Sequence, residues 1–520
     1  MSEHGPQRWV GDWSARRRAL SPDRVGLVDA TSGTEYTYAE LDRRANGCAR
    51  LLADHGVTRE GGADPDAGGR VAVLSRNRPE FVDLFFATGK TGGVLAPLSH
   101  RLAPPELGTL LDDVAPSLLV VEEPFADDAA EALADADIDC PVRSLATAGE
   151  TTWDRLDESL PADRSPYDGP TLEPAAPHLF LHTGGSTGIP KETVLSHEAI
   201  VWNATNTVTA WGLRPDDVTP LTFPMFHTGG WNVLTVPVFH MGGTVVLARE
   251  FDPGEVLELI EARSATLLVA VPAVLRMMVD HERWAETDLS TLRLAKSGGG
   301  PCRESVLSAW WDRGVDLSQG YGLTECGPNN FAMPDDWPSE KADTVGVPNV
   351  HVDVRIVDDT GTELPRGEVG ELHLRSPHAA TEYWHRPEAT AATFREDGWL
   401  ATGDLARIDD DGYVSIEGRK KNMYVSGGEN VFPAAVEDAV SGHPKVDDVV
   451  VVPVDDDQWG EVGRAVVVGD DSLTLEELTS FLDGRLARYK RPRDLVFVAS
   501  LPRSGPDKID RDAVADEYGS

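Results

Sequence analysis

The stretch Phe180-Leu-His-Thr-Gly-Gly-Ser-Thr-Gly-Ile-Pro-Lys191 joins a short apolar run to a loop of glycines, hydroxyl groups and one lysine. Glycines allow successive backbone N–H groups to point towards one centre, which creates an anion-binding nest. Ser186 and Thr187 add hydroxyl donors and Lys191 adds a positive charge, so the pattern favours a phosphate chain as ligand. A Walker A loop needs Gly-Lys-Ser/Thr, whereas here a proline precedes the lysine and a glutamate follows it. The loop is therefore either a different kind of phosphate site or a plain surface linker.

Helix and strand signals alternate on both sides of this loop. Thr37-x-x-Glu40 is a capping box at the start of a helical pattern, and Asp252-Pro253 starts another helix ahead of a buried strand at 266–271. The alternation predicts an α/β fold with layered, largely parallel sheets. Short strands and turns predict a β-rich lobe over about 350–420, whereas the Ala- and Asp-rich stretch 122–177 is expected to be peripheral. We expect a large N-terminal domain over 1–420 and a small, separate α+β domain over 421–520.

The charge balance is strongly acidic, with 47 basic against 87 acidic residues and a net charge of −40. The acidic residues are scattered along the chain, so their field repels nucleic acid and anionic membranes. Such a surface suits a salt-rich cytoplasm, where screening removes the self-repulsion. We therefore expect a halophilic source and a loss of structure at low salt.

The four cysteines, at positions 48, 140, 302 and 326, form no C-x-x-C pair, so neither a zinc site nor a disulfide framework is indicated. A reducing cytoplasm fits this pattern. No apolar run approaches about 20 residues, and the first residues show no secretory signal, so neither a membrane span nor export is expected. A homodimer remains open.

Three further runs carry chemistry. In Gln319-Gly-Tyr-Gly-Leu-Thr-Glu-Cys-Gly-Pro328, glycines flank Tyr321 and leave its ring free for a planar base, while Glu325 is a hard oxygen ligand suited to Mg²⁺. The alternative is a tight turn with an exposed glutamate. In the third run, Asp404 follows a glycine in a predicted turn, and Arg419 begins a basic patch. Such a pair can bind ribose and phosphate oxygens. The alternative is an ordinary turn aspartate and a solvated basic patch. The fourth places Lys508 on a Gly/Pro loop, where most lysines are surface residues.

These four runs, in this order, resemble the adenylate-forming (AMP-binding) superfamily, which includes acyl-CoA synthetases, adenylation domains and luciferases. The resemblance covers nearly the whole chain and is nearest to the fatty-acid–CoA ligase branch. It implies an enzyme that uses ATP and Mg²⁺ to convert a carboxylic acid into acyl-AMP with release of pyrophosphate. It also implies transfer of the acyl group to coenzyme A after the small domain has rotated.

The resemblance also implies a role for each matching residue. The phosphate loop comprises Thr183, Gly184, Gly185, Ser186, Thr187, Gly188 and Lys191. The nucleotide is further contacted by Gly298, Gly299, Gly300, Tyr321, Gly322, Thr324, Asp404 and Arg419, and Glu325 binds the metal. Lys421 lies at the interdomain hinge, and Gly427 and Gly428 line the coenzyme A tunnel. Lys508 bridges the carboxylate and the α-phosphate, and it joins Glu325, Thr187 and His227 as the expected catalytic set.

Departures from the family pattern concern the loop geometry. Gly184 and Glu192 replace the usual Ser and Gly, and a glutamate beside bound phosphates is unfavourable unless it points away. The segment 224–231 resembles the border of the acyl pocket and lacks the Asp that holds an amino acid's ammonium group. His227 either lines that pocket or packs beside the core, and the glycines at 229–230 and 298–300 are expected to leave room for an apolar tail. Loading of a carrier-protein thiol, luciferase-like oxygenation and a silent nucleotide-binding regulator are the alternatives.

Overall fold

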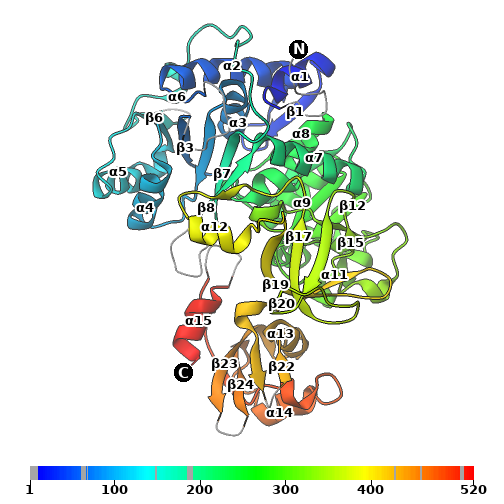
Figure 1. The fold of residues 1–520 in the computed structure, drawn as a ribbon. Coiled ribbons are helices and arrows are strands. Elements are labelled where there is room, and N and C mark those ends of the chain that lie inside the picture. Colours follow the sequence, from blue (N-terminus) through cyan, green and yellow to red (C-terminus); the bar gives the residue numbers. More distant parts are fainter. Residues whose placement is uncertain are drawn as a thin grey trace.

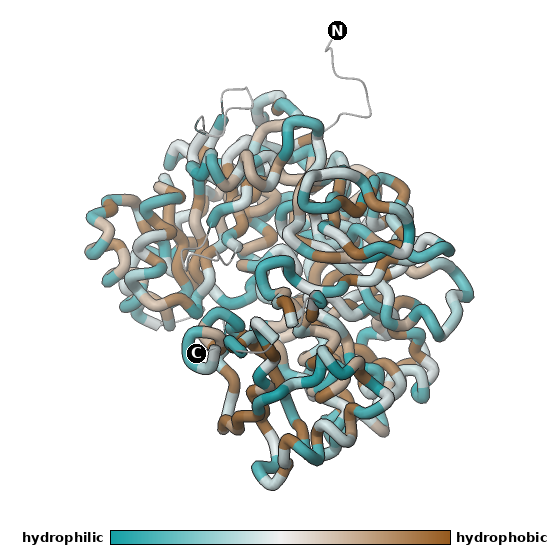
Figure 2. The backbone as a smooth tube through the Cα atoms, turned by 60° about the horizontal axis from the view of Figure 1, so that its bottom comes forward, coloured by the Kyte–Doolittle hydropathy of each residue, from teal (hydrophilic) through white to brown (hydrophobic). Residues whose placement is uncertain are grey.

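The computed structural model describes residues 10–59, 66, 68–146, 149–183, 191–426, 429–456, 459–503 and 509–519. In Figure 1 the elements up to β20 (Val414–Arg419) form a large body, and those from α13 (Pro433–Ser441) onwards form a smaller one below it. Hydrophobic and hydrophilic residues alternate along much of the tube in Figure 2, as elements with one buried face require. The predicted α/β class, with a large N-terminal and a small C-terminal part, is confirmed.

The largest sheet positions the phosphate loop. Its seven strands are, in spatial order, β18 (Glu382–Tyr383), β8 (Lys191–Ser196), β7 (Pro177–Thr183), β4 (Val94–Leu98), β3 (Arg70–Leu74), β5 (Leu118–Glu122) and β6 (Val142–Leu145). The strands from β7 to β6 are parallel, and β8 returns antiparallel to β7. Residues 184–190 therefore follow the carboxyl end of a parallel strand, the usual place for a ligand in such sheets.

Two helical layers cover this sheet, because alternate residues of each strand point to opposite faces. One face packs on α2 (Tyr38–Asp54) and α3 (Pro79–Thr91), and the other on α4 (Pro104–Val114) and α5 (Ala126–Asp135). The stretch 122–177, expected to be peripheral, contributes β6 as the edge strand of the sheet and the short helix α6 (Leu156–Ser159).

Two smaller sheets complete the α/β part of the large body. One contains β2 (Thr34–Thr37), β1 (Val25–Asp29), β10 (Thr244–Leu247) and β9 (Val218–Leu221), with α1 (Trp13–Leu20), α7 (His197–Trp211) and α8 (Thr235–Met241) nearby. The other contains β11 (Leu267–Ala270), β12 (Leu294–Ser297) and β13 (Leu317–Gln319), with α9 (Pro253–Ala262), α10 (Pro272–Val279) and α11 (Glu304–Trp311). One face of the three-stranded sheet packs on its own helices, and residues of its other face join the core of the large sheet.

The predicted β-rich lobe is a four-stranded antiparallel sheet of β16 (Asp353–Val357), β17 (Gly370–Arg375), β19 (Leu400–Ile408) and β20. Beside it lie the pair β14 (Phe331–Ala332) and β15 (Val347–Pro348) and the helix α12 (Pro387–Thr393). The C-terminal part is built from β21 (Tyr424–Ser426), β22 (Glu429–Val431), α13, β23 (Val446–Asp456), β24 (Gly460–Gly469), α14 (Leu475–Phe481), β25 (Asp494–Phe497) and α15 (Arg511–Tyr518). In the described part of the chain, no helix is long and apolar enough to cross a membrane.

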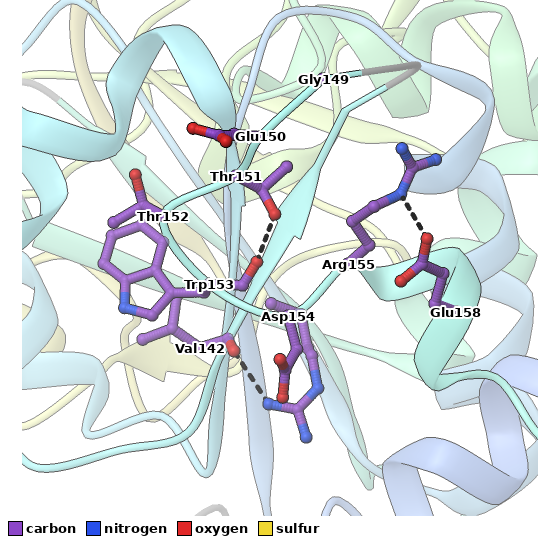
Figure 3. Close-up of a pocket in the computed structure, with 10 residues that line it drawn as sticks. Val142, Gly149, Glu150, Thr151, Thr152, Trp153, Asp154, Arg155 and Glu158 are labelled. Carbon is purple, nitrogen blue, oxygen red and sulfur yellow. Dashed lines mark hydrogen bonds and ion pairs between the residues drawn. The ribbon is translucent and has the colours of Figure 1, made fainter.

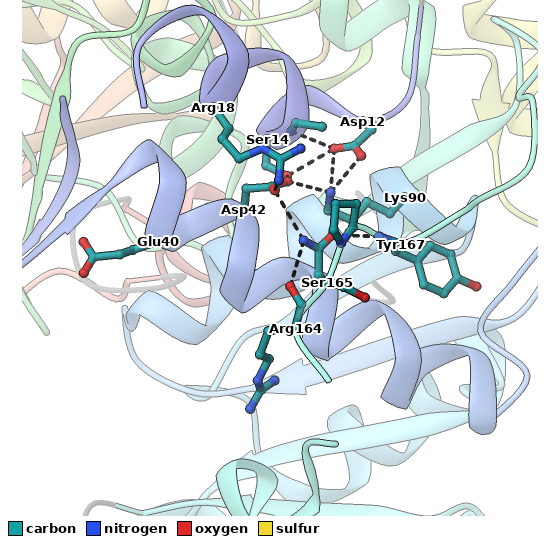
Figure 4. Close-up of polar contacts among 12 residues, drawn as sticks. Asp12, Ser14, Arg18, Glu40, Asp42, Lys90, Arg164, Ser165 and Tyr167 are labelled. Carbon is teal, nitrogen blue, oxygen red and sulfur yellow. Dashed lines mark hydrogen bonds and ion pairs between the residues drawn. The ribbon is translucent and has the colours of Figure 1, made fainter. Parts of the chain in front are cut away.

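A buried ionic cluster fastens α1 to the large body (Figure 4). The Nζ atom of Lys90, on α3, lies 2.7 Å from Asp42 Oδ1 and 2.7 Å from Asp12 Oδ2. Ser14 Oγ donates to Asp42 at 2.8 Å, and Arg18 adds an ion pair at 3.2 Å. The side chains of Lys90 and Asp42 are each only 1% exposed, so this cluster satisfies its charges internally. Nothing in the sequence pattern predicted it.

Candidate active site

The strand hairpin around the phosphate loop has the geometry that a strand–loop–strand motif requires. Thr183, the last residue of β7, pairs with Lys191, the first residue of β8, and its hydroxyl donates to the Lys191 carbonyl at 3.4 Å. Lys191 Nζ lies 5.3 Å from the centroid of the Tyr383 ring. The other predicted loop residues, Gly184, Gly185, Ser186, Thr187 and Gly188, lie outside the described residues.

Glu192 points away from this side of the hairpin. It alternates with Lys191 along β8 and shares its parity with Val194, which packs in the core on the α4 side of the sheet. The side chain is fully buried, and neither carboxyl oxygen has a hydrogen-bond partner among the described residues. Burial raises the pKa of Glu192 to about 8, with a further contribution from the negative charge of Asp113. The glutamate is therefore mostly a neutral carboxyl group up to and including neutral pH, and its side chain lies on the opposite face of the hairpin from Lys191.

The second and third runs meet at Asp404. Tyr321 follows β13, and its hydroxyl donates to one oxygen of the Asp404 carboxylate. Arg419 Nε lies 2.7 Å from the other oxygen, because β19 and β20 are paired with Asp404 opposite Arg419. Burial raises the pKa of Tyr321 well above its ordinary value, and the adjacent Asp404 carboxylate adds to this effect. The two predicted nucleotide-contacting runs thus form one contact, although the Tyr321–Asp404 hydrogen bond was not predicted.

Glu325 lies in the short 3₁₀ helix η5 (Thr324–Cys326), which also contains the buried Thr324. Its Oε1 atom accepts a hydrogen bond of 2.6 Å from the Tyr383 hydroxyl. Because the Tyr383 ring also faces Lys191, this tyrosine connects the start of β8 to the predicted metal ligand. Burial, followed by the Glu325 charge, raises the pKa of Tyr383. Sequence reasoning missed Tyr383, which no glycine or basic motif marks.

The donor set around Glu325 bears on the kind of metal it suits. Within the described residues, no three His, Cys, Asp or Glu side chains gather into a group that could hold a metal ion. Glu325 Oε2 accepts no hydrogen bond from those residues and is left for another partner. A single carboxylate fits Mg²⁺, which keeps several waters and takes its remaining ligands from substrate phosphates, better than it fits a metal that needs a protein cage.

The segment at 224–231 is more compact than expected. Its glycines begin the π-helical turn η3 (Gly229–Val233). A Cβ atom would lie 2.6 Å from the Phe223 ring at Gly229 and 2.4 Å from the Pro224 carbonyl at Gly230. These glycines permit close packing, so the expectation that they leave room for an apolar tail is wrong. Within the described part of the chain, in contrast, a Cβ at Gly298 or Gly300 would meet no heavy atom within 4 Å, and at Gly299 it would touch only Val271.

His227 is exposed, and its Nδ1 accepts from the Gly229 N–H at 3.1 Å. Close by, His182 stacks with Phe226 at a centroid distance of 6.0 Å. Burial, with a smaller contribution from nearby His227, lowers the pKa of His182 to about 4, so His182 is neutral at physiological pH. His227 thus lies at the surface of this segment, beside a second, half-buried histidine that the sequence pattern did not single out.

The C-terminal site residues are only partly described. Lys421 lies in η7 (Lys420–Asn422), between β20 and β21, and its Nζ is 2.9 Å from Asp512 Oδ2 on α15. Gly427, Gly428 and Lys508 lie outside the described residues. Gly322 is described: a Cβ there would lie 2.1 Å from the Pro328 carbonyl, which explains the need for glycine in this turn.

A surface hollow beside β6, shown in Figure 3, contains none of these residues. It is lined by Val142, Arg143, Glu158 and residues 149–155. Its polar groups largely satisfy one another, since Thr151 Oγ1 donates to the Trp153 carbonyl and Arg155 pairs with Glu158. The hollow is therefore not the candidate site.

Comparison with known proteins identifies the chain. The sequence model of the AMP-binding enzyme family matches residues 14–384, and that of the AMP-binding enzyme C-terminal domain matches 435–508. The chain belongs to the AMP-binding enzyme family. A feruloyl-CoA synthase of Amycolatopsis is 38% identical over 98% of this chain and 99% of its own. A long-chain-fatty-acid–CoA ligase of Mycobacterium tuberculosis is 34% identical over 98% of both chains.

Other AMP-binding enzymes extend the picture. A fatty acid–[acyl-carrier-protein] ligase of Streptomyces coeruleorubidus is 33% identical over 94% of this chain and 92% of its own. The crystal structure of ATP-bound MatB from Rhodopseudomonas palustris superposes with a TM-score of 0.88 at 30% identity, covering 98% of this chain and 99% of that one. The apo form of MatB, with the same identity and coverage, gives a TM-score of 0.78. By their names, the three sequence relatives are a feruloyl-CoA synthase, a long-chain-fatty-acid–CoA ligase and a fatty acid–carrier-protein ligase, so they differ in both acid and acceptor.

Proposed function

We propose that this chain is a cytoplasmic, ATP-dependent acid–CoA ligase that forms acyl-AMP and then an acyl-CoA thioester. The main support for the proposal is the convergence of three distant segments, in which Tyr383 contacts both Lys191 and Glu325. A second group of contacts is centred on Asp404, which binds both Tyr321 and Arg419. A phosphate-gripping cation, a free carboxylate oxygen and a ribose-binding carboxylate are the groups that adenylation of an acid needs.

In the first half-reaction, the acid's carboxylate attacks the α-phosphate and pyrophosphate leaves. We assign the pyrophosphate grip to Thr183, Lys191 and the loop between them. Tyr321 and its flanking glycines take the adenine, while Asp404 and Arg419 take the ribose. Glu325 would hold Mg²⁺, which neutralises phosphate charge when bound. Lys508 supplies positive charge between the two reacting anions, where it stabilises the transition state more than the ground state.

In the second half-reaction, the thiol of coenzyme A attacks the acyl-adenylate and AMP leaves. We propose that 421–520 is a mobile domain whose rotation at Lys421 withdraws Lys508 and brings the Gly427–Gly428 turn to the acyl group. The stretch between the two family matches, residues 385–434, contains the proposed boundary near residue 420 and so supports it. The higher TM-score against ATP-bound than against apo MatB supports an arrangement suited to the first step.

The test separates the two half-reactions. Lys508→Ala is expected to lose acid-dependent ATP–pyrophosphate exchange by about 100-fold or more, as expected for loss of a charge that acts in the transition state. It is expected to keep thioester formation from a supplied acyl-adenylate. Lys445→Ala, which removes a surface lysine paired with Glu477, is the matched control. Equal loss of both steps in Lys508→Ala would refute the assigned role.

A carrier-protein acceptor is the second candidate, favoured by the carrier-protein ligase among the relatives. The two differ in the final acceptor alone. AMP release with a panel of acids, with coenzyme A or a phosphopantetheinylated carrier protein, distinguishes them. No release of AMP with any acid, whichever acceptor is supplied, would instead favour a nucleotide-binding regulator.

A further inference from the structure

Lys296 is a buried cation that nothing in the nucleotide site uses. It lies on β12, two residues before Gly298, and is only 5% exposed. Its Nζ atom is 3.2 Å from Ser318 Oγ on β13 and 5.1 Å from the centroid of the Trp211 ring. Among the described residues, Lys296 forms no ion pair with a carboxylate.

A buried ammonium group without an ion pair is costly, because burial removes its hydration, and the charge of Asp316 offsets this cost only in part. Burial lowers the pKa of Lys296 to about 8, so most molecules still carry the charge at neutral pH. Of its three N–H donors, one reaches the Ser318 hydroxyl and the cation faces an aromatic ring. The remaining donors meet no acceptor among the described residues, so the group is equipped to accept an oxygen from a ligand.

The surroundings of Lys296 connect it to the candidate acyl segment. Trp211 ends α7, and one turn earlier the Thr207 hydroxyl accepts a hydrogen bond from Asn329 at 2.8 Å. Asn329 also donates to the Val233 carbonyl at 2.9 Å, at the end of the π-helical turn η3. π-Helical turns occur frequently at functional sites. Lys296 thus lies on the three-stranded sheet against the end of α7, and the preceding turn of α7 is linked through Asn329 to the turn η3.

The same position is close to the open glycines. β12 and β13 are parallel, and Lys296 and Ser318 are paired in register one residue before the strands end. Gly298 is therefore only about 7 Å further along the strand. A Cβ at Gly298 or Gly300 would meet no atom of the described residues within 4 Å, so those residues leave space beside the strand ends. Ligands of parallel sheets bind beyond such carboxyl ends.

We propose that Lys296 is a specificity residue that binds a negatively charged or hydrogen-bond-accepting oxygen at the distal end of the acid substrate. This inference rests on the proposed ligase function. It selects acids with a phenol or a second carboxylate over plain fatty acids, because an apolar tail would leave the ammonium buried and unpaired.

Paired acids of matched shape test the proposal. One pair is 4-hydroxycinnamate against 4-methylcinnamate, and the other is octanedioate against nonanoate. AMP release is measured for the wild-type enzyme, for Lys296→Met, which keeps the length of the side chain without its charge, and for the control Lys445→Met. Lys296→Gln is a second variant that keeps a hydrogen-bond donor, and circular dichroism confirms that each variant is folded.

We expect the wild-type enzyme to prefer the polar member of at least one pair. Lys296→Met is expected to lower kcat/KM for that member by about 100-fold, as for a site whose buried polar group has lost its partner, and to leave the apolar member unchanged or improved. The acid pair whose discrimination is lost in Lys296→Met shows whether Lys296 binds a phenolic or a carboxylic oxygen. A wild-type preference for apolar members, or an equal effect of Lys296→Met on both members, overturns the inference while the ligase function stands. If none of the acids in the panel supports AMP release, both the inference and the proposed ligase function are overturned.

Discussion

Two buried lysines of this fold differ in what surrounds them. Lys90, in the core beneath α1, lies within 2.8 Å of carboxylate oxygens from Asp12 and Asp42. Lys296, in the three-stranded sheet, has one hydroxyl at 3.2 Å and an aromatic ring but no ion pair among the described residues, and the Asp316 charge acts on it only from a greater distance. Both are buried to a similar extent, at 3% and 5% exposure. The difference therefore lies in pairing and not in burial.

This difference separates a structural charge from one kept for a ligand. A buried charge with complete partners stabilises the fold, because removing it leaves the opposite charges buried and unpaired. A buried charge without partners weakens the fold, and such groups persist where function needs them. The following predictions test whether pairing decides the role of each buried ionisable group.

The largest expected effect comes from Lys90→Met. The substitution leaves Asp42, which is 1% exposed, without its ammonium partner, so we expect the free energy of unfolding to fall by about 3–5 kcal/mol. Urea denaturation measures the loss. The double variant Lys90→Met/Asp42→Asn should recover part of it, because the stranded charge is gone. If the single variant is as stable as the wild type, the ion pairs of Lys90 do not stabilise the fold.

Glu192 is the acidic counterpart of Lys296, since it is buried without a partner among the described residues. Its pKa of about 8 in the folded state exceeds the ordinary value of about 4.3, so the folded state holds a proton that the unfolded state releases. The resulting stability is complete below about pH 4.3 and is lost as the pH rises to about 8.

Glu192→Gln keeps the neutral form at every pH, so the variant should be more stable than the wild type by a few kcal/mol at pH 8.5 and nearly equal at pH 5. Melting temperatures over pH 5–9 measure this difference. Glu340→Gln, at an exposed glutamate, is the control. A variant whose melting temperature tracks the wild type at all pH values would mean that Glu192 is charged or paired in the native protein.

Much of the fold could be predicted from local sequence. The capping box at Thr37 and the N-cap at Asp252 lie where the pattern placed them, and the β-rich lobe and the strands of the C-terminal part are present. These signals are short-range, because a cap or an alternating strand is decided within a few residues. The ionic cluster at Lys90 could not be predicted, since its members come from three separate elements.

The candidate site divides in the same way. Glycine-rich runs marked Tyr321, Glu325, Asp404 and Arg419, but their mutual contacts depend on strand register and long-range packing. Tyr383 lies on a two-residue strand that pairs with β8, and nothing local distinguishes it from a core tyrosine. The role of the glycines at 229–230 was misjudged, because a glycine that opens space and one that permits close packing look the same in a sequence.

A smaller effect is expected for the stability of Lys296→Met. Replacing an unpaired buried ammonium by an apolar side chain of similar length removes a desolvation penalty, so the free energy of unfolding should rise by about 1 kcal/mol. Urea denaturation at pH 7 measures the free energy of unfolding of this variant and of Lys90→Met under the same conditions. Opposite signs for the two substitutions would establish the contrast between the lysines, whereas a comparable loss in both would place Lys296 among the structural charges.

The smallest expected effect concerns Tyr383→Phe, which removes a hydroxyl and keeps the ring beside Lys191. The Glu325 carboxylate loses its 2.6 Å hydrogen bond but can hydrate, so stability should change by no more than about 1 kcal/mol. If Tyr383 positions Glu325 for the metal, the apparent KM for Mg²⁺ in ATP–pyrophosphate exchange should rise several-fold while the KM for the acid is unchanged. Tyr413→Phe, at a buried tyrosine whose ring faces Lys341, is the matched control. Tyr383 joins two segments far apart in the chain, so an unaltered Mg²⁺ dependence would mean that this contact serves packing alone, as the Lys90 cluster does.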